Sequence, residues 1–318
     1  MKRFKYLKPI KTKGIFYNSK NTGSMRLKEN IKRISIYAIL VVISLIWLLP
    51  FLYLVLQSFA VKYSPTQIIP TEWTLNNYRA LFDKNYVMKF NGKDIVFANT
   101  YPFGRWMLNT LLIATCVSIF QTILVLISAY AFSRLNFSFR QKYMKLILII
   151  GMFPGFLGMI INFYILKQIG LNTGINGIFG LILISVSGAV MGYYVSKGFF
   201  DTISKSLDEA AMIDGANKNT IFWKVIMPLS KPIIVYTILM GFTGPWGDYM
   251  FASVIAGGDT RLFNVAVGLQ QLMTKEAGTS GFPIFCAAGV IVSIPIMTLF
   301  FFLQRYYVEG VTGGAVKG

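Results

Sequence analysis

The chain has 318 residues, of which 55% are hydrophobic and only 14% are charged, and its mean hydropathy is +0.58. Because a soluble domain carries about 25% charged residues, this composition indicates an integral membrane protein, and we assign the excess of 31 Lys and Arg over 12 Asp and Glu to membrane sidedness rather than to nucleic-acid binding. Histidine is absent, and Cys116 and Cys286 lie in long apolar runs, which argues against a His-based catalytic centre, a zinc site and a disulfide framework.

Six stretches are long and apolar enough to cross a bilayer, since a hydrocarbon core of about 30 Å needs roughly 20 apolar residues in a helix. They are Ile34–Phe59, Met107–Phe132, Met144–Leu166, Ile178–Phe200, Pro232–Ala256 and Pro283–Leu303. The third and fifth contain Pro154 and Pro245 beside glycines, so we expect kinks there. The predicted fold class is an all-α integral membrane protein with six transmembrane helices.

The distribution of basic residues predicts the sidedness of these helices. The segments before the first span and after the second, fourth and sixth hold 22 of the 31 Lys and Arg residues, which by the positive-inside rule makes both termini cytoplasmic. We therefore divide the chain into a basic cytoplasmic tail (1–33), a transmembrane domain (34–304) with a cytoplasmic connection at 201–231, and a cytoplasmic C-terminal tail (305–318). We expect no cleaved signal peptide, and Met25 is an alternative start of translation.

Ionisable side chains are scarce in the predicted spans. Asp248 is the only acid there, and the bases Lys145, Lys167 and Lys197 lie near span ends. An ionisable group at the bilayer centre costs about 3 kcal/mol on insertion scales, so ion-driven transporters usually retain one for function. The scarcity weakens a secondary transporter without eliminating it, because coupling ions can also bind to carbonyl groups. With no P-loop sequence either, we expect no ATP site, no catalytic residue, no cofactor and no metal.

The connection between the fourth and fifth spans is too polar to cross a membrane, and it has the signals of a short helix. Ser206 and Glu209 have the spacing of a capping box, and Gly215 is placed to end the helix. An apolar stripe is predicted on Leu207, Ala210, Ala211 and Ile213.

A second short helix is predicted to begin at Asn219 or Thr220 and to stop before Pro228. Two interpretations of this helix pair remain open. The paired alanines let a partner surface approach closely, while Glu209 and Asp214 offer carboxylates to its basic groups. Alternatively, the segment is an amphipathic loop that lies on the bilayer, with Glu209 serving only as a cap.

One motif in this segment resembles the EAA loop of ABC-importer permeases, usually written E-A-A-x3-G-x9-I-x-L-P. The matching residues are Glu209-Ala210-Ala211-x3-Gly215 and, after nine residues, Val225-Ile226-Met227-Pro228. Val225 and Met227 are conservative departures from the pattern. Ser204 stands where many members have a proline, and a serine can itself cap a helix.

Further stretches resemble the carbohydrate-uptake branch of that family: Pro70–Phe82, Trp106-x-x-Asn109-Thr110 and Ser128–Arg134. The tail from Tyr306 to Gly318 is similar to the C-terminus of the MalG-like, maltose and maltodextrin type. The resemblance covers roughly residues 34 to 318. It implies a type I ABC-importer permease that sits in membrane lipid and pairs with a homologous, MalF-like second permease subunit.

The resemblance also implies soluble partners and the residues that meet them. An ATPase subunit dimer would receive the EAA loop as a coupling helix, with Glu209 as the ionic contact and Asp214 and Gly215 shaping the turn. The expected ATPase-coupling residues are Glu209, Ala210, Ala211, Asp214, Gly215 and Pro228. The C-terminal tail would reach the ATPases through Gly313, Gly314 and Lys317, and the glycines at 310, 313, 314 and 318 suit a thin extended segment.

On the outer side, the loop Gly257–Phe282 would meet an extracytoplasmic sugar-binding protein. A plain polar connector is the alternative. For the substrate path we expect Trp246, Asp248 and Tyr249, because a glycine-rich run before them can open the helix and present an aromatic face and a carboxylate to sugar hydroxyls. Interfacial anchoring of the two aromatic residues is the competing interpretation.

The resulting hypothesis is a sugar-importing ABC permease subunit in the bacterial cell membrane, for maltose, maltodextrin or another oligosaccharide, with ATP hydrolysed by a partner subunit. A permease of the same class for a polyol, glycerol phosphate or an amino acid is one alternative. An ion-coupled secondary sugar transporter would act without an ATPase, and a membrane scaffold would recruit a partner without solute flux.

Overall fold

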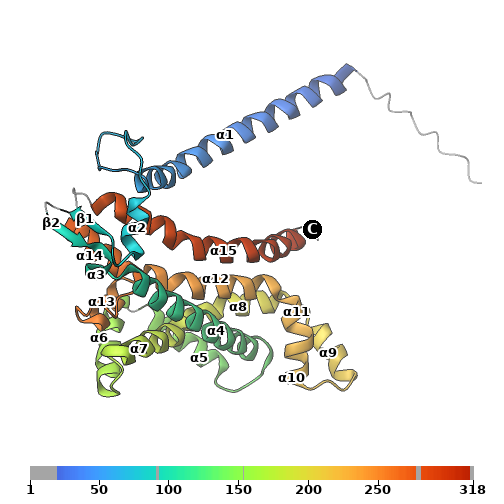
Figure 1. The fold of residues 1–318 in the computed structure, drawn as a ribbon. Helices are drawn as coiled ribbons and strands as arrows, with labels where there is room; N and C mark the ends of the chain where they lie inside the picture. The colour runs from blue at the N-terminus through green and yellow to red at the C-terminus, as the bar shows by residue number, and fades with distance from the viewer. Residues whose placement is uncertain (1–19, 91–92, 153, 277–280, 316–318) are drawn as a thin grey trace, which may run out of the picture. The chain divides into compact units, whose positions relative to one another are not determined.

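The computed structural model describes residues 20–90, 93–152, 154–276 and 281–315 and consists almost entirely of helices (Figure 1). The chain divides into two compact units, residues 1–52 and 53–318. Helix α1 runs from Lys20 to Ser58 and contains Pro50. Residues 20–33 of the predicted basic tail (1–33) therefore already belong to the first helix.

The segment after α1 folds back on the end of that helix. It contains α2 (Asn76–Phe82), the antiparallel strands β1 (Val87–Phe90) and β2 (Lys93–Val96), which pair Val87 with Val96, and α3 (Phe97–Thr100). The Asn77 side-chain amide donates to the carbonyls of Ser58 and Ala60 at 2.9 and 2.8 Å. The Tyr78 hydroxyl lies 2.6 Å from Ser58 Oγ. Asn77 thus satisfies backbone carbonyls where α1 ends, and Tyr78 pairs with a side-chain hydroxyl there.

The remaining helices of the second unit carry the predicted spans. They are α4 (Phe103–Arg134), α5 (Arg140–Gly151), α6 (Gly155–Gln168), α7 (Gly174–Ser187), the 3-10 turn η1 (Gly188–Met191), α8 (Gly192–Thr202), α9 (Lys205–Ile213), α10 (Lys218–Ile221), the π-helical turn η2 (Phe222–Ile226), α11 (Met227–Leu229), α12 (Lys231–Gly247), α13 (Met250–Ala256), α14 (Val265–Glu276) and α15 (Gly281–Ala315).

The described residues do not form six continuous membrane-spanning helices. Four helices are long and apolar enough to cross a membrane, and two bent helix pairs bring the number to six only if each pair is one span. The kink at Pro154 is confirmed as a 100° bend between α5 and α6. Pro245 lies inside α12, which ends at Gly247, so the predicted span Pro232–Ala256 is divided between α12 and α13. The sharp bend of this region lies earlier, where α11 meets α12 at 84°.

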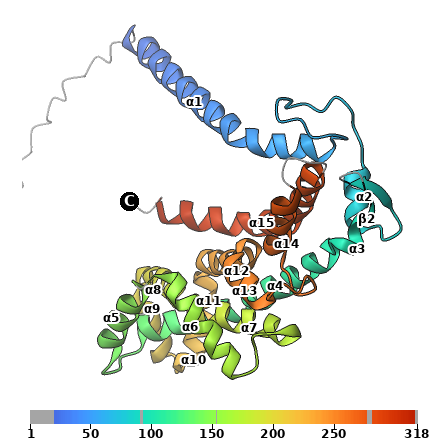
Figure 2. The ribbon, with the colours of Figure 1, turned by 90° about the vertical axis from the view of Figure 1, so that its left-hand side faces the viewer.

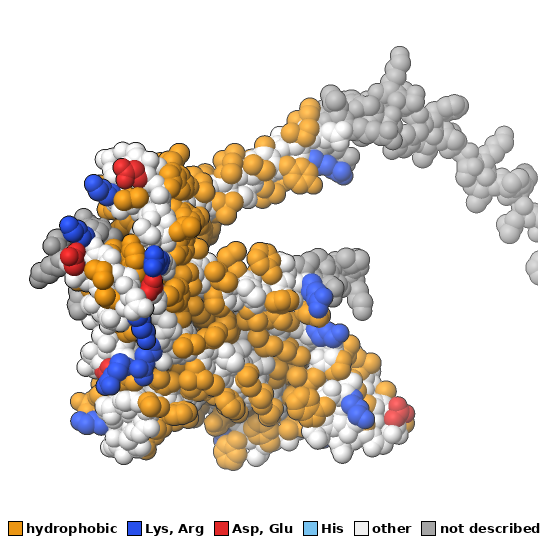
Figure 3. Space-filling view, in the orientation of Figure 1, with side chains coloured by type: hydrophobic (Ala, Val, Ile, Leu, Met, Phe, Trp, Pro, Cys, Tyr) orange, Lys and Arg blue, Asp and Glu red, His pale blue; other side chains and the backbone are white. Residues whose placement is uncertain are grey.

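The second unit has two ends that differ in the elements they carry (Figure 1), and Figure 2 is viewed from the left-hand side of Figure 1, where the first of these ends lies. The hairpin end holds β1, β2, α3, α13, α14 and the start of α4. The α9 end holds α9, α10, α11 and the end of α4. Charged side chains gather at these ends, and hydrophobic ones cover the surface between them (Figure 3). Exposed apolar residues such as Ile119, Phe120 and Ile123 on α4 suit a lipid environment, since water would disfavour so large an apolar surface.

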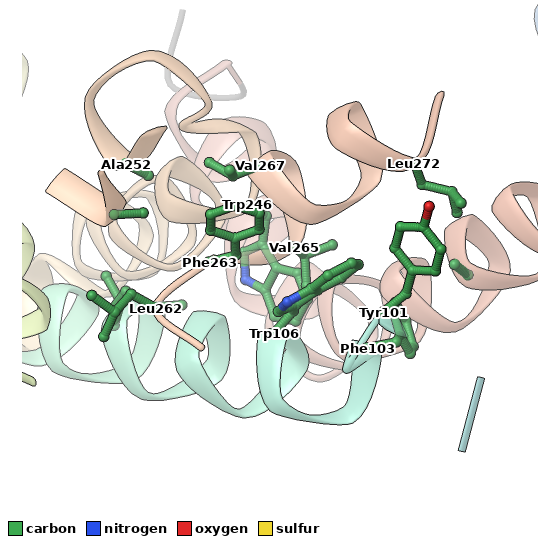
Figure 4. Close-up of a cluster of buried hydrophobic side chains, with 14 of the residues drawn as sticks. Tyr101, Phe103, Trp106, Trp246, Ala252, Leu262, Phe263, Val265, Val267 and Leu272 are labelled. Atoms are coloured by element: carbon green, nitrogen blue, oxygen red, sulfur yellow. The ribbon is translucent and has the colours of Figure 1, made fainter. Parts of the chain in front are cut away.

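The main hydrophobic core lies toward the hairpin end, where aromatic side chains of α4, α12 and the α13–α14 region meet (Figure 4). Trp106 and Phe263 pack with their rings tilted by 37° and the ring centroids 6.1 Å apart. Close approach of the backbones depends on glycines: a Cβ on Gly268 would lie 2.1 Å from the Trp106 ring, and one on Gly241 would lie 2.9 Å from the Cα of Ser118. The second contact places α12 directly against α4.

Gly241→Ala tests that crossing of α12 and α4. Because the added methyl meets backbone rather than a flexible side chain, we expect a destabilisation of about 1–3 kcal/mol and a lower melting temperature of the purified protein in detergent. Gly244→Ala is the matched control, since the same helix leaves open space there. Alanine is also the better helix former, so this variant should melt no lower than the native protein. Equal melting temperatures for the two variants would contradict the tight crossing.

Candidate functional site

The helix pair predicted between the fourth and fifth spans is present and begins with α9. Ser204 is its N-cap, and its hydroxyl accepts the backbone N–H of Ser206 at 3.3 Å. The expectation that Ser204 can cap the helix is therefore confirmed, whereas the capping box of Ser206 and Glu209 is wrong. Ser206 already lies inside the first turn, so its side chain is not in the N-cap position.

The end of α9 is a Schellman motif centred on Gly215. This glycine has a φ of +82°, in the left-handed region where a Cβ is disfavoured. Its N–H donates to the Met212 carbonyl at 3.0 Å, and the N–H of Ala216 donates to the Ala211 carbonyl at 2.9 Å. The prediction that Gly215 ends this helix is confirmed.

The second helix differs from its prediction at both ends. It begins at Lys218, because Asn217 Oδ1 accepts the N–H of Thr220 at 2.8 Å and caps it. It also continues past Pro228 to Leu229. The π-helical turn η2 precedes that proline and already departs from the regular α-helical bonding, so the missing N–H of Pro228 does not end the helix.

The helix pair is held to the end of α4 by Arg134, which sequence reasoning gave no role. Its guanidinium Nη2 donates to the carbonyls of Phe200 and Ile203 at 3.0 and 2.7 Å, at the end of α8. Its Nε lies 3.1 Å from Asp208 Oδ2 on α9, an ion pair without hydrogen-bond alignment. Only 4% of the Arg134 side chain and 13% of the Asp208 side chain are exposed. One buried cation thus joins α4, α8 and α9.

Two neighbours of Arg134 on α4 add further contacts. The Tyr130 hydroxyl donates to the Lys218 carbonyl at 3.0 Å, and its ring packs on Phe222 with centroids 4.9 Å apart. Ser133 Oγ donates to Asp201 Oδ1 at 2.6 Å. Tyr130, Ser133 and Arg134 all lie in the Ser128–Arg134 stretch, so this motif is the part of α4 that holds the α9–α11 segment.

The opposite face of α9 is exposed. Glu209 and Asp214 are exposed, as are Met212 and Ile213, the latter at 87%. Most of the apolar stripe predicted on this helix lies on this exposed face. Of its members only Ala211 packs inward, while Leu207, Ala210 and Ile213 point away from the protein. The acid that faces inward is Asp208. The exposed face combines apolar side chains with carboxylates that have no ion-pair partner among the described residues.

At the hairpin end, the Trp106-x-x-Asn109-Thr110 motif holds the loop before α14. Trp106 Nε1 donates to the Thr260 carbonyl at 2.9 Å, and Asn109 Nδ2 donates to the carbonyls of Arg261 and Phe263 at 2.9 and 3.0 Å. Thr110 Oγ1 accepts the N–H of Val265 at 2.8 Å. Each residue of the motif therefore bonds the backbone of the loop or of the first residue of α14, so this part of the loop is packed against α4, and its contact with a binding protein stays a prediction.

The charges on this loop are paired with each other. The Arg261 guanidinium donates to both carboxylate oxygens of Asp259 at 3.0 and 2.9 Å and holds the pKa of that carboxyl below its ordinary value. Asp259 is therefore ionised at neutral pH. The loop presents a zwitterionic pair rather than a single charge.

The three predicted substrate-path residues do not share one face. Trp246 is only 6% exposed and packs beside Phe242 with ring centroids 5.8 Å apart, so its aromatic face lies inside the core. Asp248 ends α12, and its Oδ1 accepts the N–H of Phe251 at 3.2 Å. Tyr249 is 45% exposed. The helix does open after Gly247, while Trp246 packs in the core of this structure, and the substrate-path role of the three residues stays a prediction.

The predicted C-terminal contact residues lie partly outside the described residues. Gly313 and Gly314 belong to α15, which continues to Ala315, and so does Gly310. These three glycines are therefore helical, and the thin extended segment expected for them is wrong. Lys317 and Gly318 fall outside the described part of the chain.

Gly215→Ala and Gly215→Asn test the turn that ends α9. An alanine forced to a φ of +82° costs about 1–2 kcal/mol, whereas asparagine adopts the left-handed conformation more readily. In the alanine variant we expect faster hydrogen exchange of the backbone amides of residues 215 and 216 than in the native protein. The exchange rates of the asparagine variant should lie between those two. Identical exchange in all three proteins would show that the turn does not depend on this glycine.

Comparison with known proteins agrees with this architecture. The model of the family described as "Binding-protein-dependent transport system inner membrane component" matches residues 121–313. The chain is 34% identical over 272 residues to the maltodextrin transport system permease protein MalD of Streptococcus pneumoniae, covering 85% of this chain and 95% of MalD. It is 33% identical over 299 residues to the galactooligosaccharides transport system permease protein GanQ of Bacillus subtilis, covering 93% of this chain and 99% of GanQ.

Two solved structures share the fold. One is the crystal structure of a bacterial ABC transporter involved in the import of the acidic polysaccharide alginate, with a TM-score of 0.69, 23% identity and coverage of 88% of this chain and 98% of that chain. The other is a bacterial alginate ABC transporter in complex with an alginate pentasaccharide-bound periplasmic protein, with a TM-score of 0.55, 18% identity and coverage of 88% and 96%. The chain belongs to the family of binding-protein-dependent transport system inner membrane components and is a multi-pass protein of the cytoplasmic membrane.

Proposed function

We propose that this chain is a permease subunit of an ATP-driven importer that moves a sugar, delivered by an extracytoplasmic binding protein, across the cytoplasmic membrane. The α9–α11 segment, residues 205–229, is the coupling element that meets the ATPase. The observation that carries this proposal is the two-sided construction of α9. Its inner face is locked to α4 and α8 through Asp208 and Arg134, while its outer face presents Glu209 and Ile213 without a partner in the described chain.

That outer face has the chemistry of a docking surface. Exposed Leu207, Met212 and Ile213 provide apolar area that association would remove from water. Glu209 and Asp214 supply carboxylates that can accept charge-assisted hydrogen bonds from Arg or Lys of a partner. A partner cleft with an apolar floor and a basic rim fits this pattern. In the assembled importer the ATPase dimer supplies that cleft.

The loop at the hairpin end supports contact with the binding protein on the other side of the membrane. It includes the paired Asp259 and Arg261 and continues into α14, all held to α4 by the Trp106, Asn109 and Thr110 contacts. A preorganised loop loses less conformational entropy on binding than a mobile one. A second, homologous permease subunit completes the central path, for which Asp248 and Tyr249 are the candidate polar groups of this chain.

The mechanism follows from these two faces. Nucleotide binding changes the spacing of the ATPases and moves the coupling elements docked on them. The locked inner face of α9 passes that displacement to α4 and α8, so the permease changes between inward-open and outward-open states. The nucleotide shifts a two-state equilibrium, which needs no charged relay inside the membrane. The C-terminal residues Gly313, Gly314 and Lys317 would add a second ATPase contact.

Charge and apolar variants on the outer face test the coupling role. In a complex of this chain with its partner permease, ATPase and binding protein, we expect Glu209→Gln to lower sugar uptake and the linked ATPase rate about tenfold, which corresponds to a loss of about 1.4 kcal/mol from a charge-assisted contact. Ile213→Asp should have an effect at least as large because it places a charge in the apolar contact.

The matched control is Glu72→Gln, which removes the same charge from an exposed position in the segment between α1 and α2. It should leave both rates unchanged. Native rates in the Glu209 and Ile213 variants would refute the coupling role of α9.

The substrate class is tested through the companion binding protein. A thermal-shift screen with maltodextrins, galactooligosaccharides and alginate oligosaccharides should give stabilisation by one oligosaccharide class, because a ligand that binds only the folded state raises its stability. The same sugar should drive uptake by the complex. Stabilisation by a polyol, glycerol phosphate or an amino acid, without response to any oligosaccharide, would replace sugar by another solute.

A further inference from the structure

We propose that α4 is a rigid connector that carries binding-protein docking at the outer loop to the coupling helix α9, and that Thr110, Asn109, Arg134 and Asp208 are the positioning residues at its two ends. This inference rests on the proposed function and deepens it, because it names the element and side chains that join the two partner-facing sites. Both sets of contacts were found on the same helix, 24 residues apart in sequence from Thr110 to Arg134.

The outer joint consists of side chains that bond the backbone of the loop. Thr110 is fully buried; its hydroxyl donates to the Trp106 carbonyl and accepts the N–H of Val265, both at 2.8 Å. The Asn109 amide bridges two carbonyls of the loop, those of Arg261 and Phe263. Because the bonds run to main-chain groups on both sides of Leu262, the loop cannot shift without moving the start of α4 or breaking them.

The inner joint also consists of a side chain of α4 that bonds the backbone of a neighbouring segment, but here the side chain is charged. Arg134 holds two carbonyls at the end of α8 and the carboxylate of Asp208 on α9. Both side chains of the ion pair are buried, so separating them would leave an unpaired charge in a low-dielectric site, which is strongly unfavourable. When α9 is displaced, we therefore expect α4 to move with it, because breaking the ion pair would cost more free energy.

Between the joints α4 is built to resist bending. It is one α-helix of 32 residues, about 48 Å long at 1.5 Å per residue, and no proline interrupts it. The other long apolar helices each contain an irregularity: Pro50 in α1, the η1 turn between α7 and α8, and Pro295 in α15. Ser118 also bonds the Ile238 carbonyl of α12 at 3.0 Å near the tight Gly241 contact. Figure 1 shows α4 running from the hairpin end to the α9 end.

The test uses the full complex in lipid nanodiscs and has three readouts. The first is the amount of ATPase subunit that copurifies with this chain, called recovery below. The other two are the basal ATPase rate, without binding protein, and the stimulated ATPase rate, with sugar-loaded binding protein. Thr110→Val removes the outer acceptor while keeping the side-chain shape. We expect normal recovery and an unchanged basal rate, with the ratio of stimulated to basal rate lowered at least about fivefold, which corresponds to about 1 kcal/mol of lost coupling free energy.

Thr122→Val is the matched control, because this buried hydroxyl on the same helix has no hydrogen-bond partner within the described residues. It should keep the native ratio. Asn109→Ala provides a second outer variant in case Thr110→Val does not fold. At the inner joint, Asp208→Asn should lower the same ratio, and Arg134→Lys should retain part of it because lysine keeps the ion pair but cannot bond both carbonyls as a planar fork.

A second measurement does not depend on ATP turnover. Addition of sugar-loaded binding protein to the native complex should change amide hydrogen exchange in residues 205–221, and Thr110→Val or Asn109→Ala should abolish that change while docking of the binding protein persists. Native stimulation ratios and a native exchange response in the outer variants would overturn the connector. Equal loss of basal and stimulated rates would also overturn it, because that pattern indicates a purely structural role. If the native complex shows no stimulation by sugar-loaded binding protein, the proposed function itself fails and this inference with it.

Discussion

The buried guanidinium of Arg134 is the constraint around which the α9 end of this protein is organised. A cation taken out of water is stable only when charge and hydrogen-bond partners surround it, and here the partners come from α8 and α9. Because Arg presents several donors in a fixed plane, one side chain can bind two carbonyls and lie beside a carboxylate at once. The positions of α4, the end of α8 and α9 are therefore mutually dependent, and a helix that would be marginal alone in water is held in one orientation.

At the hairpin end, the buried polar groups that need partners are neutral. The loop before α14 has carbonyls and an N–H that would be costly to bury unpaired, and Trp106, Asn109 and Thr110 supply the partners. The two ends differ in what they leave exposed. The α9 end presents carboxylates with apolar side chains, whereas the loop at the hairpin end presents the Asp259–Arg261 pair. In the proposed importer each end would meet a different soluble partner, while the surface between them is suited to lipid.

Glycine and proline have different effects at different positions in the membrane helices. Gly241 allows α12 to pass against the backbone of α4, and the break near Pro154 turns α6 away from α5 by 100°. In α11 the opposite happens, since Pro228 is accommodated after a π-helical turn and the 84° bend follows it. A proline pattern alone cannot separate these outcomes, because the cost of a lost N–H depends on which carbonyl it would have bonded.

The sequence alone determined the features that depend on composition and local spacing: the membrane class, the apolar stretches, the termination of α9 at Gly215 and the family resemblance of residues 209–228. These signals are local, because lipid compatibility and a left-handed turn need only the residues themselves. Tertiary structure alone decided which acid faces inward, that Trp246 belongs to the core, and what Arg134 binds. Asp208 and Glu209 are adjacent carboxylates of the same charge, and only the guanidinium brought beside them from α4, 74 residues away from Asp208 in sequence, assigns one to the interior and leaves the other exposed.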